Sequence, residues 1–295
     1  MKESLFFHGL WRSRSTYWFG LFRNKICAYN EPLHPLLANM PLDDLVSQEQ
    51  KASLRHPVLE KNMFAEFPSS LSYDADLGDV PFALNPKESH EQLYNYISQL
   101  KDAASKNQSA FFMTRSSFRG AWFREHFGGT HIYLERDTPS LLRSYNSFRG
   151  SLSWYLTSLF TIVARNANHP AFKGMADYLN LSKVDGSYGV AFEKVRRLKN
   201  ERFKQKQYTE QTKIDLVSFF HDVSLAHAQS YADLIISLEK ENQFDLKEVE
   251  QQVINITQIP IGLADYQFKS PAKPVQQSMV VSGFVADANN YLSYK

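Results

Sequence analysis

The chain has 295 residues, 43% of them hydrophobic and 22% charged, with a formal net charge of +2 at pH 7 and a single cysteine, Cys27. These values are ordinary for a soluble globular protein, give no indication of nucleic acid or a membrane surface, and exclude an internal disulfide or a cysteine-based zinc site. The sequence contains no apolar run long enough to span a membrane and no convincing signal peptide, so we expect a cytoplasmic protein in which Cys27 is a buried, inert thiol.

Predicted strands and helices alternate along most of the chain. The pattern of apolar residues predicts strands over residues 5–10, 26–29, 109–113, 130–135 and 232–238. Helices are predicted over residues 16–23, 88–104, 117–126, 139–164, 190–206, 210–230 and 245–257. This alternation predicts an α/β fold with a central, mainly parallel sheet flanked by helices. We expect one domain over residues 1–268, with an irregular helical insertion at about 38–108, and a loosely packed C-terminal extension over 269–295.

The first predicted strand ends at a cluster of basic and hydroxyl side chains. Between this strand and the next predicted helix lie Arg12, Ser13, Arg14, Ser15, Thr16 and Tyr17. A helix start attracts anions because its first backbone N–H groups lack partners and its dipole is positive there. Two surface arginines are the plainer interpretation, but cations at a helix start oppose that dipole. The loop therefore predicts a site for phosphate or a phosphate-like group.

Other polar residues follow the later strands at their carboxyl ends. Glu31 follows the second strand, Thr114 and Arg115 the third, and Arg136 the fourth. In parallel sheets ligands bind beyond these ends, which lie at one edge. Arg115 has two interpretations, a ligand contact or a salt bridge, and Arg136 with Asp137 could equally form a local ion pair.

The loop half-matches the Walker A pattern G-x-x-x-x-G-K-[ST]. Gly9 and Thr16 fit, but Arg14 stands at the second glycine and Ser15 at the lysine. Taken instead as Arg-Ser-x-Ser-Thr after a strand, it resembles the 5′-phosphosulfate loop of sulfotransferases. Arg12 stands where that family has Lys or Arg. Arg14 departs from the family's usual glycine, a residue suited to positive φ.

Two further motifs extend the resemblance to sulfotransferases. Arg136 is followed eight residues later by Ser144, the spacing of the family's 3′-phosphate motif, although Pro139 comes one residue late. Glu31-Pro32-Leu33 resembles the Glu-Pro-Leu of carbohydrate sulfotransferases. The resemblance is weak over 38–108 and 165–210.

The resemblance implies a P-loop NTPase-like sulfotransferase fold and an enzyme that uses 3′-phosphoadenosine 5′-phosphosulfate without a metal. Residues 12–17 would bind the 5′-phosphosulfate, and Arg136 with Ser144 the 3′-phosphate. Glu31 would be the base and Arg12 the transition-state clamp, with His34 a rival base. The acceptor is a hydroxyl, with a glycan suggested by the closest motif match and a lipid head group, a phenol or a peptide also open. The oligomeric state is open too.

Two other functions remain as alternatives. A P-loop kinase or other nucleotide phosphotransferase would share the loop, but the Walker lysine and a magnesium-binding carboxylate pattern are missing. A non-catalytic anion-binding protein would explain Arg14 in the glycine position. Elsewhere, we interpret His8 and His131 as core histidines, and the basic run over 194–206 as a solvated helix face rather than a binding surface.

Overall fold

The structure is a computed structural model that describes residues 3–38, 64, 66–68, 71–104, 108–146, 152–237, 246–263 and 274–293. Residues 39–63 and several positions up to 70, which belong to the predicted insertion, lie outside the described residues, as do 269–273, 294 and 295 of the predicted extension. None of the helices in the described part of the chain is both long and apolar enough to cross a membrane.

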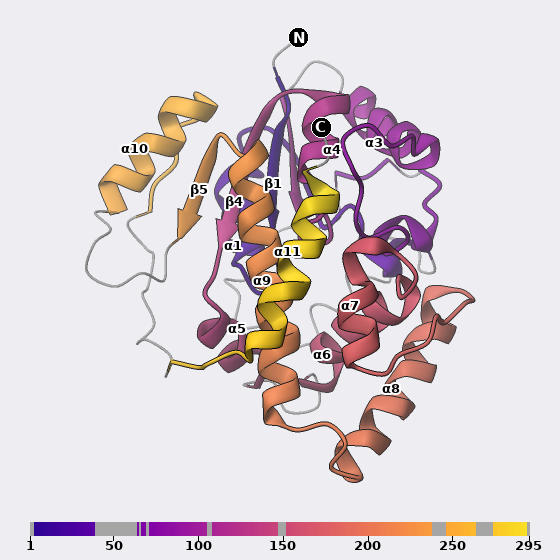
Figure 1. Cartoon of the computed structure of the whole chain (residues 1–295). Coiled ribbons are helices and arrows are strands. Elements are labelled where there is room, and N and C mark those ends of the chain that lie inside the picture. Colours follow the sequence, from indigo (N-terminus) through magenta and orange to yellow (C-terminus); the bar gives the residue numbers. More distant parts are fainter. Residues whose placement is uncertain are drawn as a thin grey trace.

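A five-stranded, fully parallel sheet forms the centre of the molecule (Figure 1). Its strands are β1 (Leu5–Gly9), β2 (Cys27–Asn30), β3 (Ser109–Met113), β4 (Thr130–Glu135) and β5 (Leu234–Ser237). They lie in the order β2-β3-β1-β4-β5, so β1 is central. The predicted sheet and α/β class are confirmed. Cys27 begins β2 and is half-buried rather than buried, and burial raises the pKa of its thiol.

Helices surround the sheet. They are α1 (Ser15–Phe22), α3 (Glu91–Ala103), α4 (Gly120–Phe127), α5 (Thr138–Asn146), α6 (Leu152–Arg165), α7 (Pro170–Tyr178), α8 (Tyr188–Lys204), α9 (Glu210–Tyr231), α10 (Leu246–Thr257) and α11 (Met279–Leu292), with short 3₁₀ turns η1 (Pro35–Ala38) and η2 (Ala75–Gly78). The helix predicted over 139–164 corresponds to α5 and α6, and residues 147–151 between them lie outside the described residues. Helix α7 was not predicted, although Ala171, Phe172, Met175 and Ala176 are buried with helical spacing.

Alternation along β1 divides the core into two faces. Phe7 packs against Phe22 of α1, with ring centroids 5.1 Å apart, and α10 contributes Val253 to the same cluster. Phe6 points the other way, where it meets Phe123 of α4 at 5.9 Å and Tyr96 of α3 joins the cluster. Because successive strand residues face opposite sides, neighbouring phenylalanines serve two separate cores.

A helical layer lies beyond the sheet and includes the C-terminal part of the chain. In Figure 1, α11 runs beside α9, with α6, α7 and α8 at the same end of the molecule. Val281, Ala288 and Leu292 of α11 are buried in the apolar cluster of this layer. The backbone N–H and hydroxyl of Ser278 donate to the Asp215 carboxylate of α9, at 2.9 and 3.0 Å. The expectation of a loosely packed extension is therefore wrong for residues 274–293.

The histidines of β1 and β4 are core residues, as predicted. His131 Nε2 lies 3.0 Å from the carbonyl oxygen of Gly128, so that nitrogen carries the proton. His131 Nδ1 then accepts from His8 Nε2 at 3.0 Å, and His8 Nδ1 accepts from the Ser116 hydroxyl at 2.7 Å. The chain of contacts assigns one tautomer to each neutral ring.

The basic run on α8 is largely solvated. Lys194, Arg197 and Lys204 are exposed, as a solvated helix face predicts. Lys199 differs, being only 4% exposed, and Arg202 donates to the carbonyl of Leu179 at 2.6 Å. Part of the run thus anchors α8 to the preceding helix.

Candidate functional site

The loop after β1 closes tightly over its own glycine. Ser13 N donates to the carbonyl of Leu10 at 3.0 Å, turning the chain back before α1 begins. A Cβ at Gly9 would collide with Ser13 Oγ and lie 3.0 Å from the carbonyl oxygen of Leu134. The loop can adopt this path because position 9 has no side chain.

Three non-glycine residues around this loop have left-handed backbone conformations. Arg12 has φ 70°, Arg14 has φ 68° and Glu31 has φ 48°. Each costs about 1–2 kcal/mol for an L-residue. Such strain is concentrated at functional sites in many proteins. Arg14 therefore has the positive φ that glycine adopts most readily.

The two anion-binding motifs predicted from separate parts of the sequence meet in space. Arg12 Nε donates to Ser144 Oγ on α5 at 3.1 Å. Arg136, just after β4, donates through one terminal nitrogen to the backbone carbonyl of Arg12 at 2.6 Å. Parallel β1 and β4 bring their carboxyl ends to the same edge, and this places α5 over the loop.

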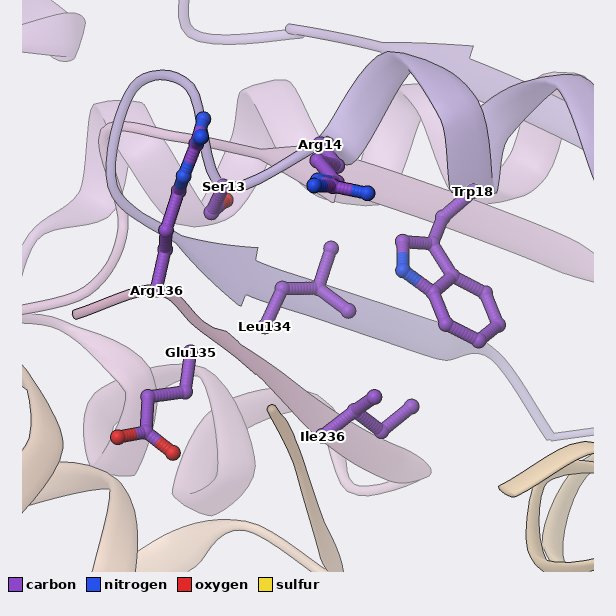
Figure 2. A pocket seen from close by; sticks show the side chains of 7 residues that line it. All are labelled: Ser13, Arg14, Trp18, Leu134, Glu135, Arg136 and Ile236. Atoms are coloured by element: carbon purple, nitrogen blue, oxygen red, sulfur yellow. The ribbon is translucent and has the colours of Figure 1, made fainter. Parts of the chain in front are cut away.

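A small pocket lies between the loop and the ends of β4 and β5. Figure 2 shows its lining, formed by Ser13, Arg14, Trp18, Leu134, Glu135, Arg136 and Ile236. Arg136 extends toward the loop, whereas Glu135 points away from it (Figure 2). The Ser13 hydroxyl is buried without a hydrogen-bond partner among the described residues. The pocket thus joins apolar side chains to two guanidinium groups, one hydroxyl and one carboxylate, of which the guanidinium groups and the hydroxyl are suited to an anion.

Glu31 lies beside the loop and is held by Thr114. Thr114 donates to Glu31 Oε2 through its hydroxyl at 2.5 Å and its backbone N–H at 3.4 Å, while Ser15 Oγ donates to Oε1 at 3.4 Å. Burial raises the pKa of Glu31, and the bonds from Thr114 and the charge of Arg115 oppose that rise. The sequence indicated that Thr114 lies at this edge of the sheet, because it directly follows β3.

His34 is a weaker base than Glu31. Its ring packs parallel to Trp154 with centroids 6.1 Å apart, and burial lowers the pKa of His34 to about 3. A nitrogen with so low a pKa removes a proton poorly near neutral pH. Of the two predicted bases, the geometry favours Glu31.

Arg115 forms a buried ion pair with Asp79, the salt-bridge alternative of its two interpretations. Its guanidinium also lies 4.9 Å from the ring centre of Trp11 and 5.3 Å from that of Tyr188. Asp79 follows η2, in the part of the sequence for which no motif was recognised. Because these partners enclose its guanidinium, Arg115 has a structural role beside Glu31.

The remaining loop residues continue into α1. Thr16 and Tyr17 are half-buried in its first turn, and the Tyr17 ring packs edge-on against Trp18 with centroids 6.2 Å apart. Tyr155 of α6, which sequence reasoning missed, lies with its ring centre 5.9 Å from the Arg12 guanidinium carbon. A tyrosine inside an apolar helical stretch carries no signal of that contact.

Comparison with known proteins adds no relative to this description. No protein-family model, no curated protein and no solved structure matches the chain.

Proposed function

We propose that this protein transfers a sulfuryl group from 3′-phosphoadenosine 5′-phosphosulfate to an acceptor hydroxyl. The observation that carries the proposal is the meeting of Arg12 with Ser144 and Arg136, which unites the two sulfotransferase-like motifs. Sulfuryl transfer needs cations around the moving group and the leaving phosphate, and a base beside the acceptor oxygen. Arg12, Arg136 and Glu31 supply such cations and such a carboxylate around the loop after β1.

The residues divide into two roles on this proposal. Arg12, Ser13, Arg14, Ser15 and the first turn of α1, including Thr16 and Tyr17, would bind the 5′-phosphosulfate, and Arg136 with Ser144 the 3′-phosphate. The buried, unpartnered hydroxyl of Ser13 supports an anion at the loop, because a buried polar group without a partner costs free energy that a ligand can recover.

Glu31 would remove the proton from the acceptor hydroxyl. Its raised pKa makes the carboxylate a better proton acceptor than an ordinary surface carboxylate. Arg12 would neutralise charge on the moving sulfuryl group. We therefore expect Arg12→Ala to abolish transfer while the fold is retained.

The test is thermal stability with adenosine 3′,5′-bisphosphate, the donor's product, compared with ATP and magnesium. A ligand at a hundredfold excess over its Kd stabilises the native state by about 2.7 kcal/mol, a rise in the unfolding midpoint of about 5 °C for a chain of this size. We expect that rise with the bisphosphate, its loss in Arg136→Ala, and its retention in Arg196→Ala, which removes an exposed arginine paired with Glu193 on α8.

Other outcomes would contradict the proposal. Stabilisation by ATP with magnesium alone would favour a nucleotide phosphotransferase. Stabilisation by the bisphosphate without transfer to any hydroxyl would favour a non-catalytic binding protein. A thermal shift in Arg136→Ala equal to that of the wild type would show that Arg136 does not bind the 3′-phosphate.

A further inference from the structure

Five aromatic side chains from three parts of the chain contact one another in a cluster next to the candidate site. We call this cluster the ring wall, and it consists of His34, Trp154, Tyr155, Tyr188 and Phe192. Trp154 links its members, because its ring lies 6.1 Å from His34, 5.3 Å from Tyr155 and 6.1 Å from Phe192. Tyr188 and Phe192, one turn apart on α8, pack at 5.8 Å. All five side chains are half-buried, so each keeps some contact with solvent.

The ring wall borders both residues proposed to carry out the transfer. Tyr155 packs on the Arg12 guanidinium, with 5.9 Å between the guanidinium carbon and the ring centre. His34 N donates to the backbone carbonyl of Glu31 at 2.9 Å, which fixes the histidine within one turn of the carboxylate. A molecule lying on these rings would therefore be next to the base and the clamp.

The polar atoms of the ring wall are already engaged or uncharged. The Tyr188 hydroxyl lies 3.4 Å from both an Arg115 nitrogen and Ser158 Oγ. The Tyr155 hydroxyl interacts with Arg12. Burial lowers the pKa of His34 to about 3, so the ring is neutral at pH 7. The Trp154 ring nitrogen and the neutral His34 ring are the hydrogen-bonding groups that the ring wall adds to these. Tyr145 stacks on the Tyr155 ring with centroids 5.4 Å apart, so that face of Tyr155 is covered. What the ring wall offers a ligand is therefore mainly the remaining aromatic surface, with few hydrogen-bonding groups.

This chemistry distinguishes between the acceptors that the sequence left open. A sugar has hydroxyls around its whole edge, and a site for it needs several oriented polar side chains. A flat aryl ring needs aromatic faces to stack on and one polar group at its hydroxyl. The ring wall with Glu31 at its border matches the second description.

We propose that the ring wall is the acceptor site, and that the acceptor is an aryl alcohol rather than a glycan. This inference rests on the proposed function for its chemistry. The aryl O–H proton passes to the Glu31 carboxylate, and the aryl oxygen forms a new bond to sulfur. The bond between sulfur and the donor's 5′-phosphate oxygen breaks, with its electron pair remaining on that oxygen. The products are an aryl sulfate and adenosine 3′,5′-bisphosphate.

The test measures binding of 2-naphthol and of methyl glucoside to the full chain by saturation-transfer NMR and titration, without any donor. We expect 2-naphthol to bind and methyl glucoside not to bind. Trp154→Ala should raise the Kd for 2-naphthol at least about tenfold, and Trp154→Phe, which keeps a ring, should change it less than about threefold. Tyr94→Ala, which removes an exposed tyrosine on α3, should leave the Kd unchanged.

Circular dichroism of each variant separates lost binding from lost folding, and Phe192→Ala serves as a second variant if Trp154→Ala does not fold. Three outcomes would overturn the inference. They are binding of methyl glucoside in place of 2-naphthol, binding of neither compound, and a Kd for 2-naphthol that stays unchanged in both Trp154→Ala and Phe192→Ala. The thermal shift with adenosine 3′,5′-bisphosphate reports on the donor site alone. Failure of that shift with intact 2-naphthol binding would thus reject the sulfotransferase proposal and leave the ring wall as an aryl-binding site.

Discussion

Thr114 shows how one side chain adjusts another at the candidate site. Its hydroxyl and backbone N–H both donate to Glu31 Oε2, and a carboxylate that accepts hydrogen bonds is stabilised in its charged form. Burial acts in the opposite direction and raises the pKa of Glu31. Two opposing effects thus set the pKa of Glu31. A substitution at Thr114 can remove the hydrogen bond and leave the burial unchanged.

We predict that Thr114→Val raises the pKa of Glu31 further, because the hydroxyl that favours the carboxylate is lost while burial remains. The acidic limb of the pH–rate profile should move to higher pH, and carboxyl ¹³C NMR of Glu31 should show the same direction. Thr114→Ser keeps the hydroxyl and should restore the wild-type profile. An acidic limb that stays in place in Thr114→Val would show that Glu31 is not the titrating base.

At the scale of elements, α9 joins the sheet to the helical layer. Its C-terminal Tyr231 packs near Tyr133 of β4, while Phe219 and Phe220 belong to the cluster of the helical layer. Helix α4 approaches α9 at Gly120, where a Cβ would overlap the ring of Tyr231. The helices can lie this close because position 120 carries only hydrogen.

We predict that Gly120→Ala lowers the free energy of unfolding by about 3 kcal/mol, because the tyrosine ring or one of the helices must move to admit the methyl group. Gly283→Ala is the matched control on α11, where nothing lies within 4 Å of the added Cβ. That change should raise the free energy of unfolding by about 0.5–1 kcal/mol, since alanine is the better helix former. Denaturant titration measures the change in the free energy of unfolding of each variant. Equal changes in the two variants would contradict the close packing of Gly120 against Tyr231.

The whole molecule contains a group of buried neutral histidines. Burial lowers the pKa of His8 well below its usual value, that of His131 to about 4 and that of His227 to about 3. In the unfolded chain these rings titrate near 6.5. The folded protein therefore binds fewer protons than the unfolded chain once the pH falls below about 6.5, and its stability decreases in that range.

We predict that these three histidines make the free energy of unfolding fall as the pH decreases below about 6.5, and that each ring still neutral in the folded protein contributes up to about 1.4 kcal/mol per pH unit. His227→Gln keeps an acceptor for the Ala121 N–H, which now lies 3.3 Å from His227 Nε2, but does not titrate. The slope should fall by about 1.4 kcal/mol per pH unit in that variant. Urea unfolding across this pH range measures it, and an unchanged slope would mean that His227 is protonated in the folded state.

The sequence by itself determined the strands of the sheet, most of the helices and the edge at which the polar residues gather. The strands over 109–113 and 130–135 could be predicted to the residue because apolar and β-branched or aromatic runs are local properties. Arg12, Glu31 and Arg136 could be placed together because every parallel strand delivers its carboxyl end to the same edge. The helix predicted over 210–230 matches α9 to within one residue.

Only the tertiary structure decided which of these residues touch. The contact of Tyr155 with Arg12, the pairing of Arg115 with Asp79 and the assembly of the ring wall join positions far apart in the chain, and no local pattern encodes such distances. Helix α11 packs on α7 and α9 because both leave apolar surface for it, which its own sequence does not reveal. Local propensity sets the elements, whereas burial and packing between distant segments set the site.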